Sequence, residues 1–583
     1  MRTFYFFLTA ALAAVSLPAL PGAAATYHTA AASGADTAAG TAAAPFQTIQ
    51  RGVDALKPGD TLLIGPGVYR ERVSVARGGT KAAPLTIAAA PGARVVVTGA
   101  DRLRGWEKVA GNDPIFLHDN WNLAFPINRR ADGTLELSHP DDKRHELIGR
   151  AEQVIAGERM LRQVLQRGQL APGTFFADLD AKKLYAWLAT NEDPNGAEME
   201  ASTRSEWLVT EPGANFVRLR GLTFRYAANH AQRGAFRLGN DYGRGENPNG
   251  WVIEDCVFER ANGPGASLAG SGHVLRRCAF TDNGQLGFGA SRCHDSRLEN
   301  CRIERNNTKG YSTGWEAGGC KVTLSRGFVF DGCRAVDNRG PGIWYDIGNE
   351  KAEVKNCFIE GNDEAGIFYE ISYGLHAHNN LIVNNANRGE SPGGAWGMGG
   401  VTLSSSENCV VENNTFAFNR DGLALREHER TTPRINDRPG AAEVRIFNRN
   451  HVVRNNIIAY SQAFNIALWM DTTFFGPHPS GGDNNKPTSE DPRTLNLRFE
   501  NNLLAALPGR PNYLYGASWR SKSRQPDTPA AFAQTSGLDV SGSRAVSDPG
   551  FRDARAGDFS LSPTSPARAV GAGPRPAAAL RTR

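Results

Sequence analysis

The sequence repeats one short unit and places a carboxylate in it each time. "GIWYDI" at residues 342–347 returns as "GIFYEI" at residues 366–371. Asp346 lies 13 residues after Cys333, and Glu370 lies 13 residues after Cys357. The two carboxylates therefore occupy the same phase of a repeating unit.

The pattern around these carboxylates predicts where they point and how far apart they lie. Side chains alternate along a strand, so Trp344 and Asp346 point away from Ile343 and Tyr345. Because the isoleucines need a core, we expect Asp346 and Glu370 on the outer face. Neighbouring strands are about 4.8 Å apart, which would hold the two carboxyl groups about 5 Å apart and raise one pKa relative to the other.

That spacing indicates a defined chemistry. Retaining glycosidases hold their two carboxyl groups about 5 to 5.5 Å apart, whereas inverting enzymes need room between them for a water molecule. Trp344 and Phe368 flank the pair on the same face, where aromatic rings could stack on a sugar. Acidic residues are also ordinary on an outer β-surface, so an alternative is that the shared phase has no catalytic meaning.

The elements that position the pair follow from a longer series. Cysteines and then asparagines recur at steps of 22, 23, 32, 24, 23, 34, 42 and 46 residues, so a basic unit of 22 to 24 residues is lengthened in places by loops. The series is Cys256, Cys278, Cys301, Cys333, Cys357, Asn380, Asn414, Asn456 and Asn502.

Short strand-like runs at this period, with Gly or Asn at the corners, predict a solenoid. We therefore predict an all-β chain that forms a right-handed parallel β-helix. Its cysteines would stack inside, and each asparagine would bond to the amide of its neighbour. The "LxxLxL" pattern of leucine-rich repeats is missing.

The series also divides the chain. Residues 1–25 combine one Arg, an apolar run and small residues, which predicts a cleaved secretory signal and export to the periplasm or the exterior. Residues 26–105 read as an amino-terminal cap and first coils, and residues 106–205 break the rhythm as an inserted β-rich, sandwich-like module. Residues 206–583 form the main β-helix with its closing coil.

Composition excludes several partners. A formal charge of +5, from 65 basic and 60 acidic residues, is too mild to indicate nucleic acid. No later apolar run approaches the roughly 18 residues of a membrane span.

The eight cysteines are expected to be buried free thiols. Five share one phase of the repeat, and stacked residues of parallel strands suit the disulfide dihedral badly. No two cysteines have the close spacing of zinc ligands, so we predict no metal.

Two further segments supply candidate substrate contacts. "GWEAGGCKV", just before Asp346, contains Trp315, Glu316 and Lys321, and Lys321 should project from the outer face. "DGLALREHER" contains Arg426 and His428 on one strand face, where Arg426 could bind sugar hydroxyls or orient a carboxylate.

With these residues in place, the chain resembles the β-helix glycoside hydrolases of the pectate-lyase-like superfamily, most closely glycoside hydrolase family 120, the β-xylosidases. The specific part runs from "GWEAGGCKV" to "GIFYEIS". The resemblance implies a β-sandwich insertion, Asp346 as nucleophile and Glu370 as general acid and then base. It also implies an oligosaccharide or polysaccharide substrate and no cofactor.

Two other functions stay open. A polysaccharide lyase or epimerase would abstract a proton beside a uronate carboxylate with Lys321 or Arg426, often with calcium. A non-catalytic carbohydrate-binding solenoid would bind without turnover. The sequence does not specify the sugar, the linkage or the oligomeric state.

Overall fold

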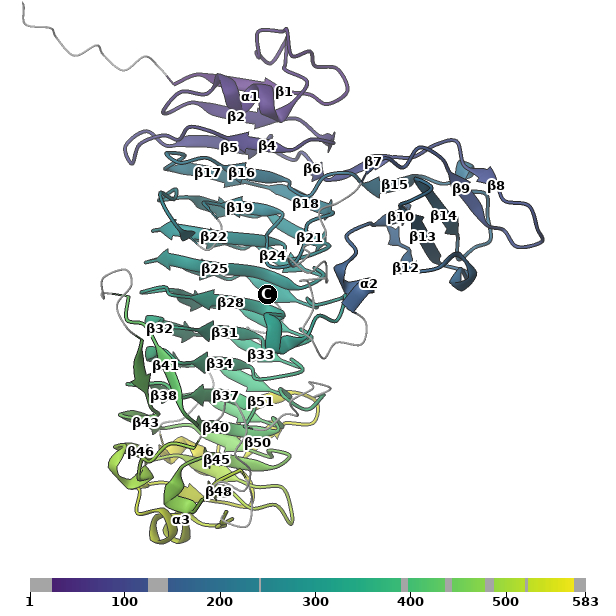
Figure 1. The fold of residues 1–583 in the computed structure, drawn as a ribbon. Coiled ribbons are helices and arrows are strands. Elements are labelled where there is room, and N and C mark those ends of the chain that lie inside the picture. Colours follow the sequence, from purple (N-terminus) through teal and green to yellow (C-terminus); the bar gives the residue numbers. More distant parts are fainter. Residues whose placement is uncertain are drawn as a thin grey trace, which may run out of the picture.

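The computed structural model describes residues 24–123, 145–240, 243–388, 397–435, 443–477, 487–518 and 523–570. Apart from its last two residues, the predicted signal segment lies outside this part of the chain. The described chain winds into coils whose strands stack into three long parallel sheets (Figure 1). The all-β parallel solenoid is therefore confirmed.

Sheet A runs the length of the solenoid. Within the described residues, its strands in spatial order are β1 (Thr26–Thr29), β2 (Thr61–Ile64), β5 (Leu85–Ala89), β17 (Val217–Arg220), β20 (Val252–Glu254), β23 (Val274–Arg276), β26 (Arg297–Glu299), β29 (Val329–Asp331), β32 (Glu350–Lys355), β35 (Tyr373–His378), β38 (Val410–Glu412), β43 (His451–Arg454) and β46 (Leu497–Glu500).

Sheet B takes the next strand of each coil. Its described strands are β3 (Gly67–Tyr69), β6 (Val95–Thr98), β18 (Leu222–Ala227), β21 (Val257–Ala261), β24 (Ala279–Thr281), β27 (Arg302–Glu304), β30 (Arg334–Val336), β33 (Phe358–Glu360), β36 (Leu381–Val383), β39 (Thr415–Ala417), β44 (Ile457–Ala459), β47 (Leu503–Ala505) and β49 (Arg544–Ala545).

Sheet C completes the coil and carries the repeated carboxylates. Its described strands are β4 (Val73–Val75), β16 (Leu208–Thr210), β19 (Phe236–Leu238), β22 (Ala266–Ser271), β25 (Leu286–His294), β28 (Gly318–Thr323), β31 (Ile343–Asp346), β34 (Ile367–Glu370), β37 (Gly399–Ser404), β40 (Asp421–Glu427), β45 (Phe464–Met470) and β48 (Tyr513–Gly516).

Asparagine explains how the coils stay in register. The side-chain amide of Asn380 donates to Oδ1 of Asn414 at 2.9 Å, Asn414 donates to Asn456 at 3.1 Å, and Asn456 donates to Asn502 at 3.0 Å. The asparagine that precedes each of these four takes a left-handed φ between 52° and 55°. Asparagine tolerates that conformation, so in each "NN" the first residue forms the turn between strands and the second forms the hydrogen-bonded ladder.

Small and aromatic side chains fill the interior of the coils. All eight cysteines are free and buried, as the shared phase predicted. Phe258 stacks between Phe224 and Phe280, with ring centroids 5.3 Å and 4.9 Å apart. The identical phase of these residues in successive coils produces the stack.

A separate group of strands leaves the solenoid between β6 and β16 and lies beside it in Figure 1. Its first strand begins at Ala100, ahead of the boundary at residue 106 that the sequence suggested. One sheet contains β7 (Ala100–Arg102), β10 (Val154–Ala156), β11 (Arg159–Met160) and β15 (Met199–Ser202). The other contains β8 (Glu107–Lys108), β9 (Phe116–His118), β12 (Arg162–Val164), β13 (Thr174–Asp178) and β14 (Lys183–Trp187).

This strand group contacts the solenoid at the segment that precedes β28. Ile148, at its helix α2 (His145–Gly149), packs with Tyr311 and Ala317. The Tyr311 hydroxyl donates to the Ile148 carbonyl at 3.1 Å. The segment before β28 is thus held by the inserted strands.

The remaining elements are short helices, 3-10 turns and two hairpins. The described helices are α1 (Ile49–Ala55), α2 and α3 (Pro529–Ser536), with 3-10 turns η1 (Arg167–Gln169), η2 (Pro194–Gly196), η4 (Thr313–Trp315), η5 (Thr473–Phe475), η6 (Pro492–Thr494) and η7 (Pro566–Val570). Two hairpins pair β41 (Arg430–Thr432) with β42 (Val444–Ile446) and β50 (Phe551–Asp553) with β51 (Asp558–Leu561).

Candidate active site

The outer face of sheet C brings the predicted carboxylates together. Thr323 of β28 lies beside Asp346 of β31. Ile343, Trp344 and Tyr345 pair with their counterparts in β34, so the same register places Glu370 next to Asp346. Their positions on adjacent strands match the expectation from the repeat.

Lys321 binds Asp346 directly. Its Nζ lies 2.9 Å from Oδ2 of Asp346 and 2.9 Å from Oε1 of Glu316, and the Lys321 side chain is 7% exposed. The prediction that Lys321 projects from the outer face is confirmed. A lysine between two carboxylates neutralises part of the negative charge that the acidic pair brings to this face.

Burial and the neighbouring charges shift the pKa values of Asp346 and Lys321. The pKa of Asp346 is raised to about 6, mainly by burial; Lys321 lowers this pKa, and the charge of Glu370 adds to the rise. Burial would lower the pKa of Lys321, but Asp346 and Glu316 hold it above its ordinary value. Asp346 Oδ1 is buried and makes no hydrogen bond with any described residue. Buried orphan oxygens are rare and call for an explanation such as a catalytic role.

Glu370 has its own cation, which sequence reasoning missed. Arg430 Nη1 donates to Glu370 Oε1 at 2.7 Å, and the Glu370 side chain is 10% exposed. The two carboxylates therefore rest between separate cations, Lys321 on one and Arg430 on the other. Each cation contacts one oxygen of one carboxylate, and both carboxylate side chains are at most 10% exposed.

Arg430 begins β41, in a segment that leaves sheet C after β40. This segment folds back over the coils of the acidic pair. There Thr432 Oγ1 donates to the Ile371 carbonyl at 2.9 Å, and the Ile435 amide donates to Glu350 at 3.2 Å. The spacing of "REHER" places Arg430 in phase with Arg426 and His428, which was the available signal. The spacing gave no indication that Arg430 would contact Glu370, which lies 60 residues earlier in the chain.

The two aromatic residues lie deeper than expected. Trp344 and Phe368 stack with centroids 5.5 Å apart, but they are only 6% and 5% exposed. Lys321 Nζ lies 4.1 Å from the Trp344 ring centroid, and Met398 packs against the pair. The expectation of exposed aromatics was therefore wrong, because side chains from other coils cover the rings.

The other predicted contacts surround this centre. The Arg426 guanidinium lies 5.6 Å from the Phe368 ring centroid. His428 Nε2 lies 3.4 Å from Arg430, and burial, followed by the charges of Arg426 and Arg430, lowers the pKa of His428 to about 3. His428 is thus neutral at physiological pH. Trp315 lies in η4, and its side chain is outside the described part.

A groove crosses sheet C on the strands that precede the acidic pair, and the two carboxylates are not among its lining residues. Lys321 and Glu316 form one end, and Gly289 and Ser267 lie in register with Lys321 on the two preceding strands. A Cβ added at Gly289 would meet no atom within 4 Å. The groove therefore has a floor of small residues next to Lys321, which binds Asp346.

A family match and one solved structure agree with this fold. The right handed beta helix region family matches residues 244–397. The structure of XylC with xylose aligns over 84% of this chain and 85% of its own, with 17% identity and a TM-score of 0.57. The pectate lyase Pel9A aligns over 93% of this chain and 90% of its own, with 13% identity and a TM-score of 0.34.

At 17% identity the likeness to XylC shows the fold and leaves the reaction open. No curated protein matches the sequence. Among the described residues, no helix has the length and apolar character needed to cross a membrane.

Proposed function

We propose that this protein is a retaining glycoside hydrolase that acts on a glycan or oligosaccharide, with Asp346 as nucleophile and Glu370 as general acid and base. The observation that carries the proposal is the pair of carboxylates on adjacent strands, each held by its own cation. One strand spacing, about 4.8 Å, is close to the separation that a double displacement requires.

The first step forms a glycosyl-enzyme intermediate. The Asp346 carboxylate attacks the anomeric carbon while protonated Glu370 gives its proton to the departing glycosidic oxygen. Arg430 occupies Oε1 of Glu370, and no hydrogen bond from the described residues reaches Oε2, which we assign to the proton. Lys321 stabilises the Asp346 carboxylate before attack.

The second step reverses these roles. Glu370 takes a proton from water, whose oxygen attacks the anomeric carbon and breaks the bond to Asp346. Both carboxyl groups return to their starting states, and the sugar leaves with its configuration retained. The xylose in the XylC structure makes β-xylosides the first substrates to test.

The lyase alternative has less support from the geometry. A lysine that abstracts a proton must reach its neutral form. Lys321 lies between Asp346 and Glu316, which favour its charged form. The non-catalytic alternative leaves the buried orphan oxygen of Asp346 unexplained.

The test combines turnover with trapping. Aryl glycosides, neutral glycans and uronate polysaccharides are screened for released aglycone, new reducing ends and the ultraviolet absorbance of unsaturated uronides. A 2-deoxy-2-fluoro glycoside of the best sugar is then incubated with the enzyme, and the labelled peptide is identified by mass spectrometry.

We expect hydrolysis that is abolished in Asp346→Asn and Glu370→Gln, and a label on Asp346. Glu259→Gln, which changes a partly exposed carboxylate of β21 in sheet B, should keep full activity. An unsaturated product would establish the lyase instead, and binding without turnover would establish a binding solenoid.

A further inference from the structure

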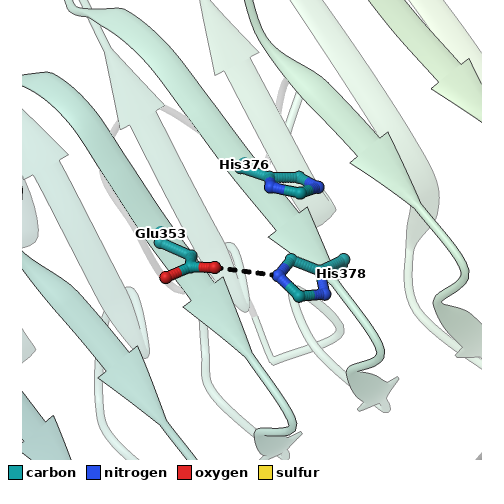
Figure 2. A group of neighbouring side chains, drawn as sticks. All are labelled: Glu353, His376 and His378. Carbon is teal, nitrogen blue, oxygen red and sulfur yellow. Dashed lines mark hydrogen bonds and ion pairs between the residues drawn. The ribbon is translucent and has the colours of Figure 1, made fainter.

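A second group of chemically capable side chains lies on sheet A, away from the acidic pair. His376 and His378 are two residues apart in β35, so both point outward. In register, Glu353 of β32 lies beside His376, and Glu412 of β38 lies beside His378. Figure 2 shows Glu353 and the two imidazoles converging from neighbouring strands.

The potential ligand atoms of this group are close together. One ligand atom from each of Glu353, His376 and His378 lies within 4.8 Å of the others. His378 Nε2 is 3.0 Å from Glu353 Oε1, and His376 Nε2 is 2.9 Å from Glu412 Oε1. The two rings stack with centroids 4.2 Å apart and an angle of 29° between their planes.

Solvent reaches these side chains. His376 is 43% exposed, Glu353 is 27% exposed, and His378 and Glu412 are 17% and 15% exposed. A hydrated ion could therefore enter without opening the solenoid. We infer that Glu353, His376 and His378 form a binding site for a divalent transition metal, with Glu412 next to it.

The donor set specifies the class of ion. Two imidazole nitrogens and carboxylate oxygens suit Zn²⁺, Ni²⁺ or Cu²⁺, whereas Ca²⁺ and Mg²⁺ prefer oxygen ligands alone. Glu412 keeps its contact with the His376 ring and would orient it, as carboxylates do for histidines that bind zinc. Because the ligand atoms lie within 4.8 Å of one another, small side-chain movements would let them surround one ion.

Binding requires a change of protonation that the neighbours can accept. The Asn379 side-chain nitrogen lies 2.9 Å from His378 Nδ1 and donates to it. The ring proton is then on Nε2, which donates to Glu353 when no ion is bound. An ion at Nε2 moves that proton to Nδ1, and the Asn379 amide turns its oxygen to accept it. No proton need leave His378.

The principal competitor is a lysine. Lys355 Nζ lies 2.9 Å from Oε2 of Glu353 and neutralises part of its charge. Arg454 Nε likewise lies 2.6 Å from Glu412 Oε2. Removing Lys355 should therefore strengthen metal binding. If the four side chains form only a structural hydrogen-bond network, neither the wild type nor this variant should bind a metal.

The site would join the coils that carry the acidic pair. Glu353 follows Asp346 by seven residues, and His376 follows Glu370 by six. An ion held between β32 and β35 would thus link these two coils on sheet A. Its expected effect is greater resistance of the fold to heat.

The experiment uses the untagged mature chain, freed of metal with EDTA and dialysed. ZnCl₂ and NiCl₂ are titrated calorimetrically, and melting is followed by circular dichroism with and without each ion. We expect about one ion per chain and a higher melting temperature, because a ligand that binds only the folded state stabilises it.

Variants separate this site from adventitious binding. The double change His376→Gln and His378→Gln should weaken binding at least tenfold, and Lys355→Met should strengthen it several-fold. His28→Gln, a partly exposed histidine of β1, is the matched control and should bind as the wild type does. No saturable heat up to about 1 mM ion, or equal binding by the double variant, would overturn the proposal.

Discussion

Replacing Lys321 by Met should move the pH dependence of the proposed hydrolase. Asp346 must be ionised to attack, and its pKa of about 6 predicts that activity falls as the pH drops below 6. Lys321 opposes that rise through a 2.9 Å contact. Without this cation, the Asp346 pKa must rise further.

The size of the shift follows from the contact. A hydrogen bond to a charged group contributes about 1.5 to 3 kcal/mol, which corresponds to about one to two pKa units. The acidic limb of kcat/KM should therefore move from about 6 to between about 7 and 8. At pH 6 this reduces the ionised fraction of Asp346 by about 5- to 50-fold, and the reduction becomes smaller as the pH rises above the new pKa.

The assay measures kcat/KM on an aryl glycoside across this pH range for Lys321→Met and for Lys351→Met. Lys351 is an exposed lysine of β32 and serves as the control, whose profile should match the wild type. An acidic limb that stays near 6 or moves to lower pH, or a loss that is equal at every pH, would refute the assignment.

The same variant should also change the free energy of unfolding. Removing one partner of a buried ion pair costs about 3 to 5 kcal/mol, because the other charge is left unpaired. Lys321→Met should therefore lower the free energy of unfolding, and adding Asp346→Asn should recover much of that loss. A double variant no more stable than Lys321→Met would contradict the direct coupling.

Further predictions address the rest of the structure. Arg430→Met should lower kcat by at least tenfold with partial recovery in Arg430→Lys, measured by steady-state kinetics; an unchanged kcat would show that the 2.7 Å contact does not orient Glu370. Gly289→Phe should lower kcat/KM for long oligosaccharides and spare short aryl glycosides, and an equal effect on both would remove the groove from the substrate path. Burial raises the pKa of Glu427 to about 8, so its proton contributes stability that is full below its unfolded pKa and is lost as the pH rises through 8. Glu427→Gln should therefore raise the melting temperature at pH 9 far more than at pH 5, and equal shifts would exclude this titration.

Much of the fold could be predicted because its signals are local and repeated. The phase of the cysteines and asparagines records which side chains stack, and the alternation around Asp346 records which face they occupy. Both depend only on neighbours within one coil and on the coil period. The carboxylate pair was predictable for the same reason.

The rest depends on contacts between distant parts of the chain. Arg430 reaches Glu370 only because the segment after β40 turns back, and no period in the sequence encodes that turn. Trp344 and Phe368 alternate like exposed residues, yet Met398 and Lys321 cover them. A strand pattern distinguishes inside from outside but does not show what later packs on the outside.

The stacking of coils also restricts how such a site could evolve. Carboxylates carried at one phase can be separated only by whole numbers of strand spacings, about 4.8 Å for adjacent coils and about 9.6 Å when one coil is skipped. The first value is close to the requirement for retention, and the second lies at the upper limit for inversion, about 6.5 to 9.5 Å. Moving Glu370's carboxylate to the next strand, at Ser404, would thus change the stereochemical outcome in one discrete step.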